Sequence, residues 1–194
     1  MQKKLILATV LGGLTLFLWA FISHSLLGWY APQYRTFTNQ DAVEEAIVSG
    51  VSGSGLFLLP NMTPQQKSLP SAERAVAEAE MMERLFRGPM VFAVIRVGPS
   101  ASFPVLLLIQ LLLSLLAALT AAWLLYRAGL ATYGSRVAFV AALSLPIVFW
   151  AKLPAWNWWS FPAGFTFVES VDALIGWTLL GVVLGRLIRP EIPD

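Results

Sequence analysis

The sequence predicts an all-α membrane protein of four transmembrane helices, with a small α+β extracytoplasmic domain inserted between helices 1 and 2. Hydrophobic residues make up 57% of the 194 residues and charged residues only 12%, about half the charged share of a soluble domain. The apolar residues also gather in four long stretches, which are Leu5–Trp29, Val105–Leu125, Val137–Trp150 and Phe165–Leu184. All but the third reach the roughly 20 residues that a helix needs to cross a bilayer core.

The first stretch, in residues 1–29, is expected to be an uncleaved membrane anchor. It has the basic start and apolar run of a secretory signal, but it is too long for one and no small-x-small cleavage site follows Ile22. Basic residues lie beside this stretch and at the inner ends of the others, at Lys3, Lys4, Arg127, Arg136, Arg186 and Arg189. The positive-inside rule therefore predicts that both termini are cytoplasmic and that residues 30–103 lie outside.

Residues 30–103 predict an α-β-α-β domain. The expected elements are a helix over Ala42–Ser49 capped by Thr38, a strand over Leu56–Leu59, a helix from Pro70 to Arg87 and a strand over Met90–Val97. The segment holds six basic and seven acidic residues, which leaves no basic patch for nucleic acid. Two strands bury too little apolar surface to be stable alone. We expect the domain to pack on its own helices or to be covered by the membrane-facing loops, by a second copy or by another subunit.

Residues 104–194 hold the other three predicted spans, and the third is short. Only residues 137–151 separate Arg136 from Lys152, and at about 1.5 Å per residue they do not cover the hydrocarbon core. One or both of these side chains must therefore snorkel to the surface or be paired.

Four polar side chains are expected at similar depth near the outer surface: His24, Lys152, Glu169 and Asp172. Glu169 and Asp172 are three residues apart, so they lie about one helical turn apart on one face. A charge inside the membrane costs on the order of 3 kcal/mol unless it is paired or hydrated. One interpretation is a structural cluster in which Lys152 pairs with the carboxylates and orients helices 3 and 4; the other is a site that handles protons or ions.

The sequence predicts no catalytic residues, no metal site and no cofactor. It contains no cysteine and one histidine, which excludes cysteine-pair redox enzymes and bis-histidine haem ligation. Phosphate-binding glycine loops, nucleophile elbows and zinc signatures are also missing. A bound lipid, quinone or pigment stays open, including a pigment or haem that His24 would ligate together with a partner chain.

Residues 151–164 are expected to form a rigid, tryptophan-rich outer loop, broken by Pro154 and Pro162. The aromatic residues in and beside it are Trp150, Trp156, Trp158, Trp159 and Phe161. Such residues are typical of an aromatic belt at the lipid headgroups. They would also suit stacking on a flat apolar ligand or contact with another subunit.

Small residues predict where the helices approach each other. Gly181 and Gly185 form a GxxxG pair in the fourth span, and Ala8 and Gly12 form a small-xxx-small pair in the first. These faces are sufficient for a monomeric bundle.

The stretch Trp156–Pro162, followed by a span with Glu169 and Asp172, resembles a group of small bacterial four-span inner-membrane proteins of unknown function. The resemblance covers roughly residues 150–185 and implies the bacterial inner membrane, without an activity. With no catalytic constellation, we expect a non-catalytic accessory or stabilising subunit whose partners are membrane lipid and other membrane-protein subunits. The alternative is a small transporter or proton-linked membrane enzyme that uses the intramembrane carboxylate pair.

Overall fold

The computed structural model describes residues 2–189, and the chain divides into two compact units. The helical unit comprises residues up to Arg35 and from Ala101 onward; the small unit comprises Thr36–Ser100. Four helices in the helical unit are long and apolar enough to cross a membrane. They are α1 (Gln2–Ser25), α5 (Phe103–Ala128), a third helix over Tyr133–Trp159 and α9 (Ala163–Leu187).

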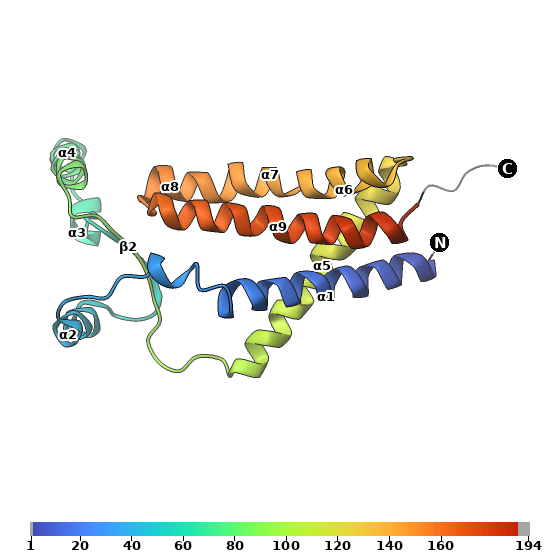
Figure 1. The fold of residues 1–194 in the computed structure, drawn as a ribbon. Coiled ribbons are helices and arrows are strands. Elements are labelled where there is room, and N and C mark those ends of the chain that lie inside the picture. The colour runs from blue at the N-terminus through green and yellow to red at the C-terminus, as the bar shows by residue number, and fades with distance from the viewer. Residues whose placement is uncertain (1, 190–194) are drawn as a thin grey trace. The chain divides into compact units, whose positions relative to one another are not determined.

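The helices of this unit pack in the order α5, α1, α9 and third helix (Figure 1). Helix α1 contacts both α5 and α9, and α9 contacts both α1 and the third helix. The buried core is Ala8, Ala118, Ala121, Ala122, Leu125, Val140, Leu180, Leu184 and Ile188. These residues lie toward the start of α1 and the ends of α5 and α9. The helices are therefore held most closely at the end that carries the basic residues.

Glycines allow the closest approaches. A Cβ on Gly12 would lie 2.7 Å from Leu180 Cδ1, and a Cβ on Gly181 would lie 2.8 Å from the carbonyl oxygen of Val137. A Cβ on Gly185 would lie 3.3 Å from Val137 Cγ2. The GxxxG face of α9 therefore packs on the third helix, and Gly12 lets α1 approach α9.

The third helix is longer than the sequence analysis predicted. It runs for 27 residues, Tyr133–Trp159, instead of ending at Trp150. Its parts are α6 (Tyr133–Ala142), α7 (Ser144–Ile147), a π-helical segment η2 (Val148–Lys152) and α8 (Leu153–Trp159). The predicted outer loop 151–164 is thus helical as far as Trp159, and the connection to α9 is only residues 160–162.

Two prolines explain these internal changes of helix type. A proline lacks an N–H and clashes with the carbonyl four residues before it, which is Ala142 for Pro146 and Trp150 for Pro154. Helix α6 ends at Ala142, and Trp150 lies in the π-helical segment. The chain therefore adapts its hydrogen bonding at each proline, and the helix continues to Trp159.

Arg136 lies inside the third helix and is only 6% exposed. Its guanidinium donates hydrogen bonds to the carbonyl oxygens of Gly185 (2.8 Å), Leu130 (3.0 Å) and Ala131 (2.7 Å). Gly185 is in the last turn of α9, where carbonyls lack a partner within the helix. Arg136 thus ties the end of α9 to the connection between α5 and α6.

The small unit contains helices α2 (Gln40–Gly50), α3 (Pro64–Lys67) and α4 (Ser71–Arg87) and strands β1 (Gly55–Leu59) and β2 (Val91–Ile95). The strands are antiparallel, with Leu56 opposite Val94 and Leu58 opposite Phe92. The α-β-α-β order agrees with the sequence, but α3 was not predicted. The cap of α2 is Asn39 and not Thr38, because Asn39 Oδ1 accepts from the backbone N–H of Ala42 at 3.1 Å.

Candidate functional site

Lys152 and Glu169 form an ion pair between the third helix and α9. Lys152 Nζ lies 2.9 Å from Glu169 Oε1, and the two side chains are 30% and 24% exposed. Lys152 is the last residue of the π-helical segment and lies two residues before Pro154. The π-helical segment that accommodates Pro154 therefore ends at the charged residue Lys152. The ion pair joins the third helix to α9 at this point.

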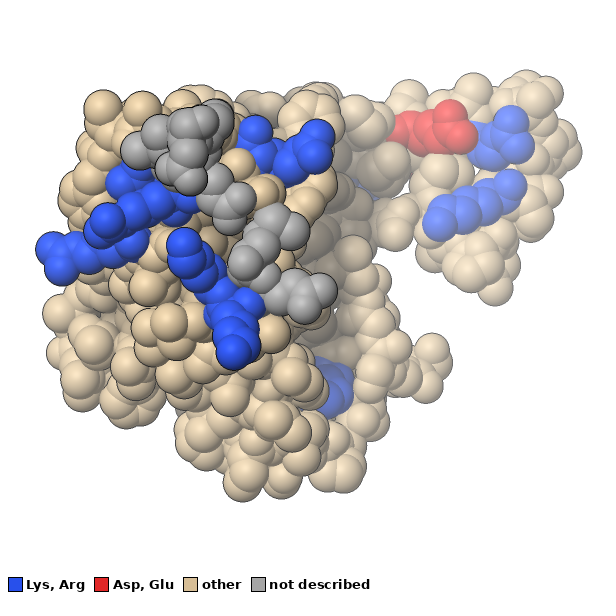
Figure 2. All heavy atoms as spheres, turned by 90° about the vertical axis from the view of Figure 1, so that its right-hand side faces the viewer, with Lys and Arg blue, Asp and Glu red and all other residues tan. Residues whose placement is uncertain are grey.

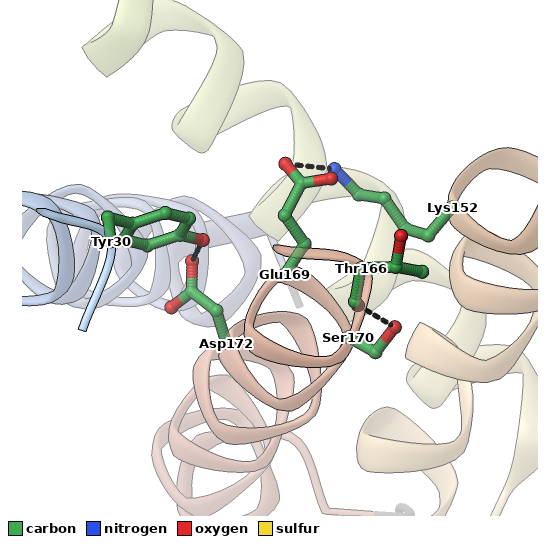
Figure 3. A network of polar contacts seen from close by, with 6 residues as sticks. All are labelled: Tyr30, Lys152, Thr166, Glu169, Ser170 and Asp172. Carbon is green, nitrogen blue, oxygen red and sulfur yellow. Dashed lines mark hydrogen bonds and ion pairs between the residues drawn. The ribbon is translucent and has the colours of Figure 1, made fainter. Parts of the chain in front are cut away.

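Asp172 belongs to a different set of contacts. Figure 3 shows Glu169 pointing toward Lys152, whereas Asp172 points toward Tyr30. Asp172 Oδ1 accepts a hydrogen bond from Trp19 Nε1 at 2.7 Å, and Oδ2 accepts one from the Tyr30 hydroxyl at 2.9 Å. The sequence predicts that Lys152 lies within reach of both carboxylates, whereas the structure pairs it with Glu169 alone. Asp172 instead joins α9 to α1 and to the segment that follows α1.

Tyr30 is the centre of this second set. It is 6% exposed, and its ring lies against those of Trp29 and Phe165, with centroid distances of 6.2 Å in each case. Burial raises the pKa of the Tyr30 hydroxyl far above its ordinary value, and the hydrogen bond to the Asp172 carboxylate raises it further. The phenol therefore stays protonated and donates to Asp172 throughout the physiological range.

His24 also reaches this set, but through Tyr30. The imidazole stacks on the Tyr30 ring, with centroids 4.3 Å apart and planes inclined by 19°, and Nδ1 lies 3.0 Å from the carbonyl oxygen of Ala20. With Nδ1 bound to the backbone, this side chain is positioned by its own helix and by one aromatic neighbour. No group of three or more metal-ligating side chains occurs in residues 2–189.

The four polar residues proposed from the sequence thus form two separate sets: Lys152 with Glu169, and Asp172 with Tyr30, Trp19 and His24. Trp19 and Tyr30 were missed. Both carry one polar atom on an apolar ring, and both occur close to His24 in the sequence. The sequence signal for Trp19 and Tyr30 was that each can donate a hydrogen bond, and that a carboxylate near the membrane surface needs such donors.

The tryptophans in and beside the predicted outer loop, Trp150, Trp156, Trp158 and Trp159, lie in helical segments. Trp150 and Trp158 are 88% and 72% exposed, while Trp156 lines an apolar groove of about 340 Å³ with Val148 and Phe167. Phe161 follows the helix and lies 5.8 Å from the Phe165 ring. Exposed aromatic side chains at the end of a membrane-crossing helix are typical of a belt at the lipid headgroups.

A second groove of about 300 Å³ lies where α1, α5 and α9 meet. Its polar lining includes Gln110 and Asp172, and its apolar lining includes Leu16, Leu113 and Trp177. Asp172 thus lines this groove, whereas Glu169 does not. Chemically, the site can hold helices together through two satisfied carboxylates, and it can offer one of them to a small polar solute.

Comparison of the chain with protein-family models, with curated protein sequences and with solved structures found no significant match. Its function is therefore inferred from the geometry of the two units.

Proposed function

We propose that the protein is a non-catalytic accessory or stabilising subunit of a larger complex in the bacterial inner membrane. Both termini lie in the cytoplasm and the small unit lies outside. One observation carries the proposal: the small unit has almost no core of its own. Of its residues only Pro60, Met62 and Ala77 are buried, and α2 has no buried residue.

Large apolar side chains of the small unit instead face outward. Phe86 is 83% exposed, Val94 82% and Val48 69%. Burial of apolar surface contributes about 25 cal/mol per Å², and a domain stabilises itself mainly in this way. A unit that leaves such residues in water gains stability when another surface covers them. The exposed edges of a two-stranded sheet supply backbone donors and acceptors for the same partner.

The intramembrane groups support a structural role. Glu169 is paired with Lys152, and both oxygens of Asp172 accept hydrogen bonds. Removing the partner of a paired carboxylate is destabilising, so these contacts help to hold the bundle together. The exposed Trp158, at the end of the third helix, offers a further contact for the partner.

Native electrophoresis of solubilised membranes tests this proposal. The wild-type chain should migrate in a complex of defined stoichiometry, and Val94→Glu, Phe86→Glu or Trp158→Ala should release it without lowering the melting temperature of the helices. Gln65→Glu adds the same charge at an exposed polar position of α3 and should leave the complex intact.

Hydrogen exchange on the full chain gives an independent measure. Backbone amides of β1 and β2 should exchange rapidly in the purified chain and slowly in the complex, because only the partner buries them. A chain that is monomeric in native membranes, with strand amides already protected, would contradict the proposal.

The groove beside Asp172 favours a second candidate, a small transporter or proton-linked membrane enzyme. In that case the purified chain alone, in liposomes, should show pH-dependent uptake of a solute or of protons. Asp172→Asn should abolish the uptake, whereas Glu169→Gln, which does not line this groove, should retain it. Stoichiometric partners without such uptake favour the accessory subunit.

A further inference from the structure

A cavity of about 230 Å³ lies at the basic end of the helical unit, between the start of α1 and the ends of α5 and α9. Its apolar lining consists of Leu5, Leu187, Ile188 and the rings of Trp123 and Tyr126. Three cationic side chains complete the lining, namely Lys4, Arg127 and Arg189. Each of the three cations comes from a different helix or helix end, so the cavity depends on the packed bundle.

The charges around this cavity are not compensated within the described residues. In residues 2–189 the side chains of Lys4 and Arg127 form no hydrogen bond or ion pair, and Arg189 Nε donates only to the carbonyl oxygen of Arg186, at 3.3 Å. Figure 2 shows Lys and Arg gathered on this face. The described carboxylates of the helical unit, Glu169 and Asp172, lie near the opposite end of α9, where each has its own partners.

We infer that this cavity binds the headgroup of an anionic phospholipid. The cationic side chains of the lining match the phosphate, and its apolar side chains match the glycerol backbone and the first acyl carbons, which a soluble anion lacks. Trp123 and Tyr126 are 54% and 38% exposed, as aromatic residues at the headgroup level commonly are. Basic pockets between transmembrane helices on the cytoplasmic side are known to recognise such headgroups.

The test uses the purified full chain in a mild detergent, with dioleoylphosphatidylglycerol and dioleoylphosphatidylcholine as probes. These lipids share their acyl chains and differ in headgroup charge. Native mass spectrometry and lipid-dependent melting should both show preference for phosphatidylglycerol, by about tenfold or more. The variant Lys4→Gln/Arg127→Gln should lose most of that preference, and Trp123→Ala should weaken binding of phosphatidylglycerol with no change in charge.

The matched control is Lys3→Gln/Arg186→Gln, which removes the same charge at the same end from residues that do not line the cavity. It should retain the preference. Equal loss in the two double variants would mean diffuse attraction and would overturn the site. Melting without lipid checks that each variant folds, and Arg127→Gln alone replaces Lys4→Gln/Arg127→Gln if that double variant does not fold.

Two further arms separate other occupants. Glycerol 3-phosphate should not compete with the lipid at equal concentration; competition would mean a site for a soluble anion. The chain also carries Glu191 and Asp194, outside the described residues. Glu191→Gln/Asp194→Asn should leave lipid binding unchanged, and a protein that binds lipid only after this change would show that its own terminus fills the cavity.

Discussion

Lys152 pairs with the carboxylate of Glu169 and not with that of Asp172, and double variants can test this pairing. Lys152→Met should lower stability by about 1–2 kcal/mol, less than for a fully buried pair because both side chains are partly exposed. The reason is that Glu169 is left without its partner. Adding Glu169→Gln should recover much of the loss in detergent melting, whereas adding Asp172→Asn should not. Equal recovery by both would mean that Lys152 is shared.

Tyr30 gives a second prediction at the level of single residues. Tyr30→Phe removes the hydroxyl that donates to Asp172 Oδ2 and keeps the ring that stacks on His24. An unsatisfied acceptor costs about 1–3 kcal/mol, so the melting temperature should fall. Tyr34→Phe is the control, because Tyr34 is 67% exposed. If the two variants melt alike, the Tyr30 hydroxyl does not support Asp172.

The raised pKa of Tyr30 determines the pH at which the stabilisation by its hydrogen bond to Asp172 is lost. Its pKa is higher in the folded chain than in the unfolded chain, where it is about 10. The stabilisation is therefore complete below about pH 10 and declines as the pH rises further, because the unfolded chain releases its proton first. Melting of the wild-type protein should fall more steeply above that pH than melting of Tyr30→Phe.

The site residues that could be predicted from the sequence are the charged residues that lie within or beside apolar stretches. Lys152, Glu169 and Asp172 stand out because a charged group in an apolar stretch needs a partner. The partners of Asp172 could not be predicted in the same way. Trp19 and Tyr30 are ordinary residues near a membrane surface, and only the packing of α1 on α9 brings them to the carboxylate.

Among the elements, the contact of α9 with the third helix depends on Gly181. Gly181→Ala places a Cβ against the Val137 carbonyl, which is backbone and cannot move aside. Overpacking of this kind costs about 1–3 kcal/mol. Gly134→Ala is the control, because nothing lies within 4 Å of its Cβ position. Thermal melting should fall for the first variant and stay equal or rise for the second.

The third helix shows why its end could not be predicted. Proline normally ends a helix, so Pro154 indicated a loop after Trp150. The chain instead inserts the π-helical segment Val148–Lys152 and continues to Trp159. Whether a proline ends or only perturbs a helix depends on the neighbouring helix, and here α9 lies alongside and Glu169 holds Lys152. Composition alone contains neither contact.

At the scale of the whole molecule, the orientation in the membrane is a prediction that single cysteines can test. The chain has no cysteine of its own, so one introduced at Ser71 or at Ala131 is the only reactive thiol. In intact cells an impermeant maleimide should label the first and not the second, because cytoplasmic loops are rich in Lys and Arg. Reversed labelling would place the basic end and its cavity outside.

The four long apolar helices could be predicted from length and hydropathy, but the order in which they pack could not. Leucines face lipid as readily as they face another helix, so the pattern does not identify the buried side. Leu112 and Leu116 are 51% and 60% exposed, whereas Leu125 on the same helix is 1% exposed. The small residues Ala8, Gly12 and Gly181 were the better guide to the helix contacts.

The contacts of Arg136 and Lys152 also bear on how the helices insert into the membrane during synthesis. Both cations lie in the third helix, and both bind groups of α9, at Gly185 and Glu169. Those groups are synthesised later, so while the third helix is leaving the ribosome its two charges have not yet met these partners. The third and fourth helices are therefore expected to enter the bilayer as one hairpin, in a single cooperative step of the translocation machinery.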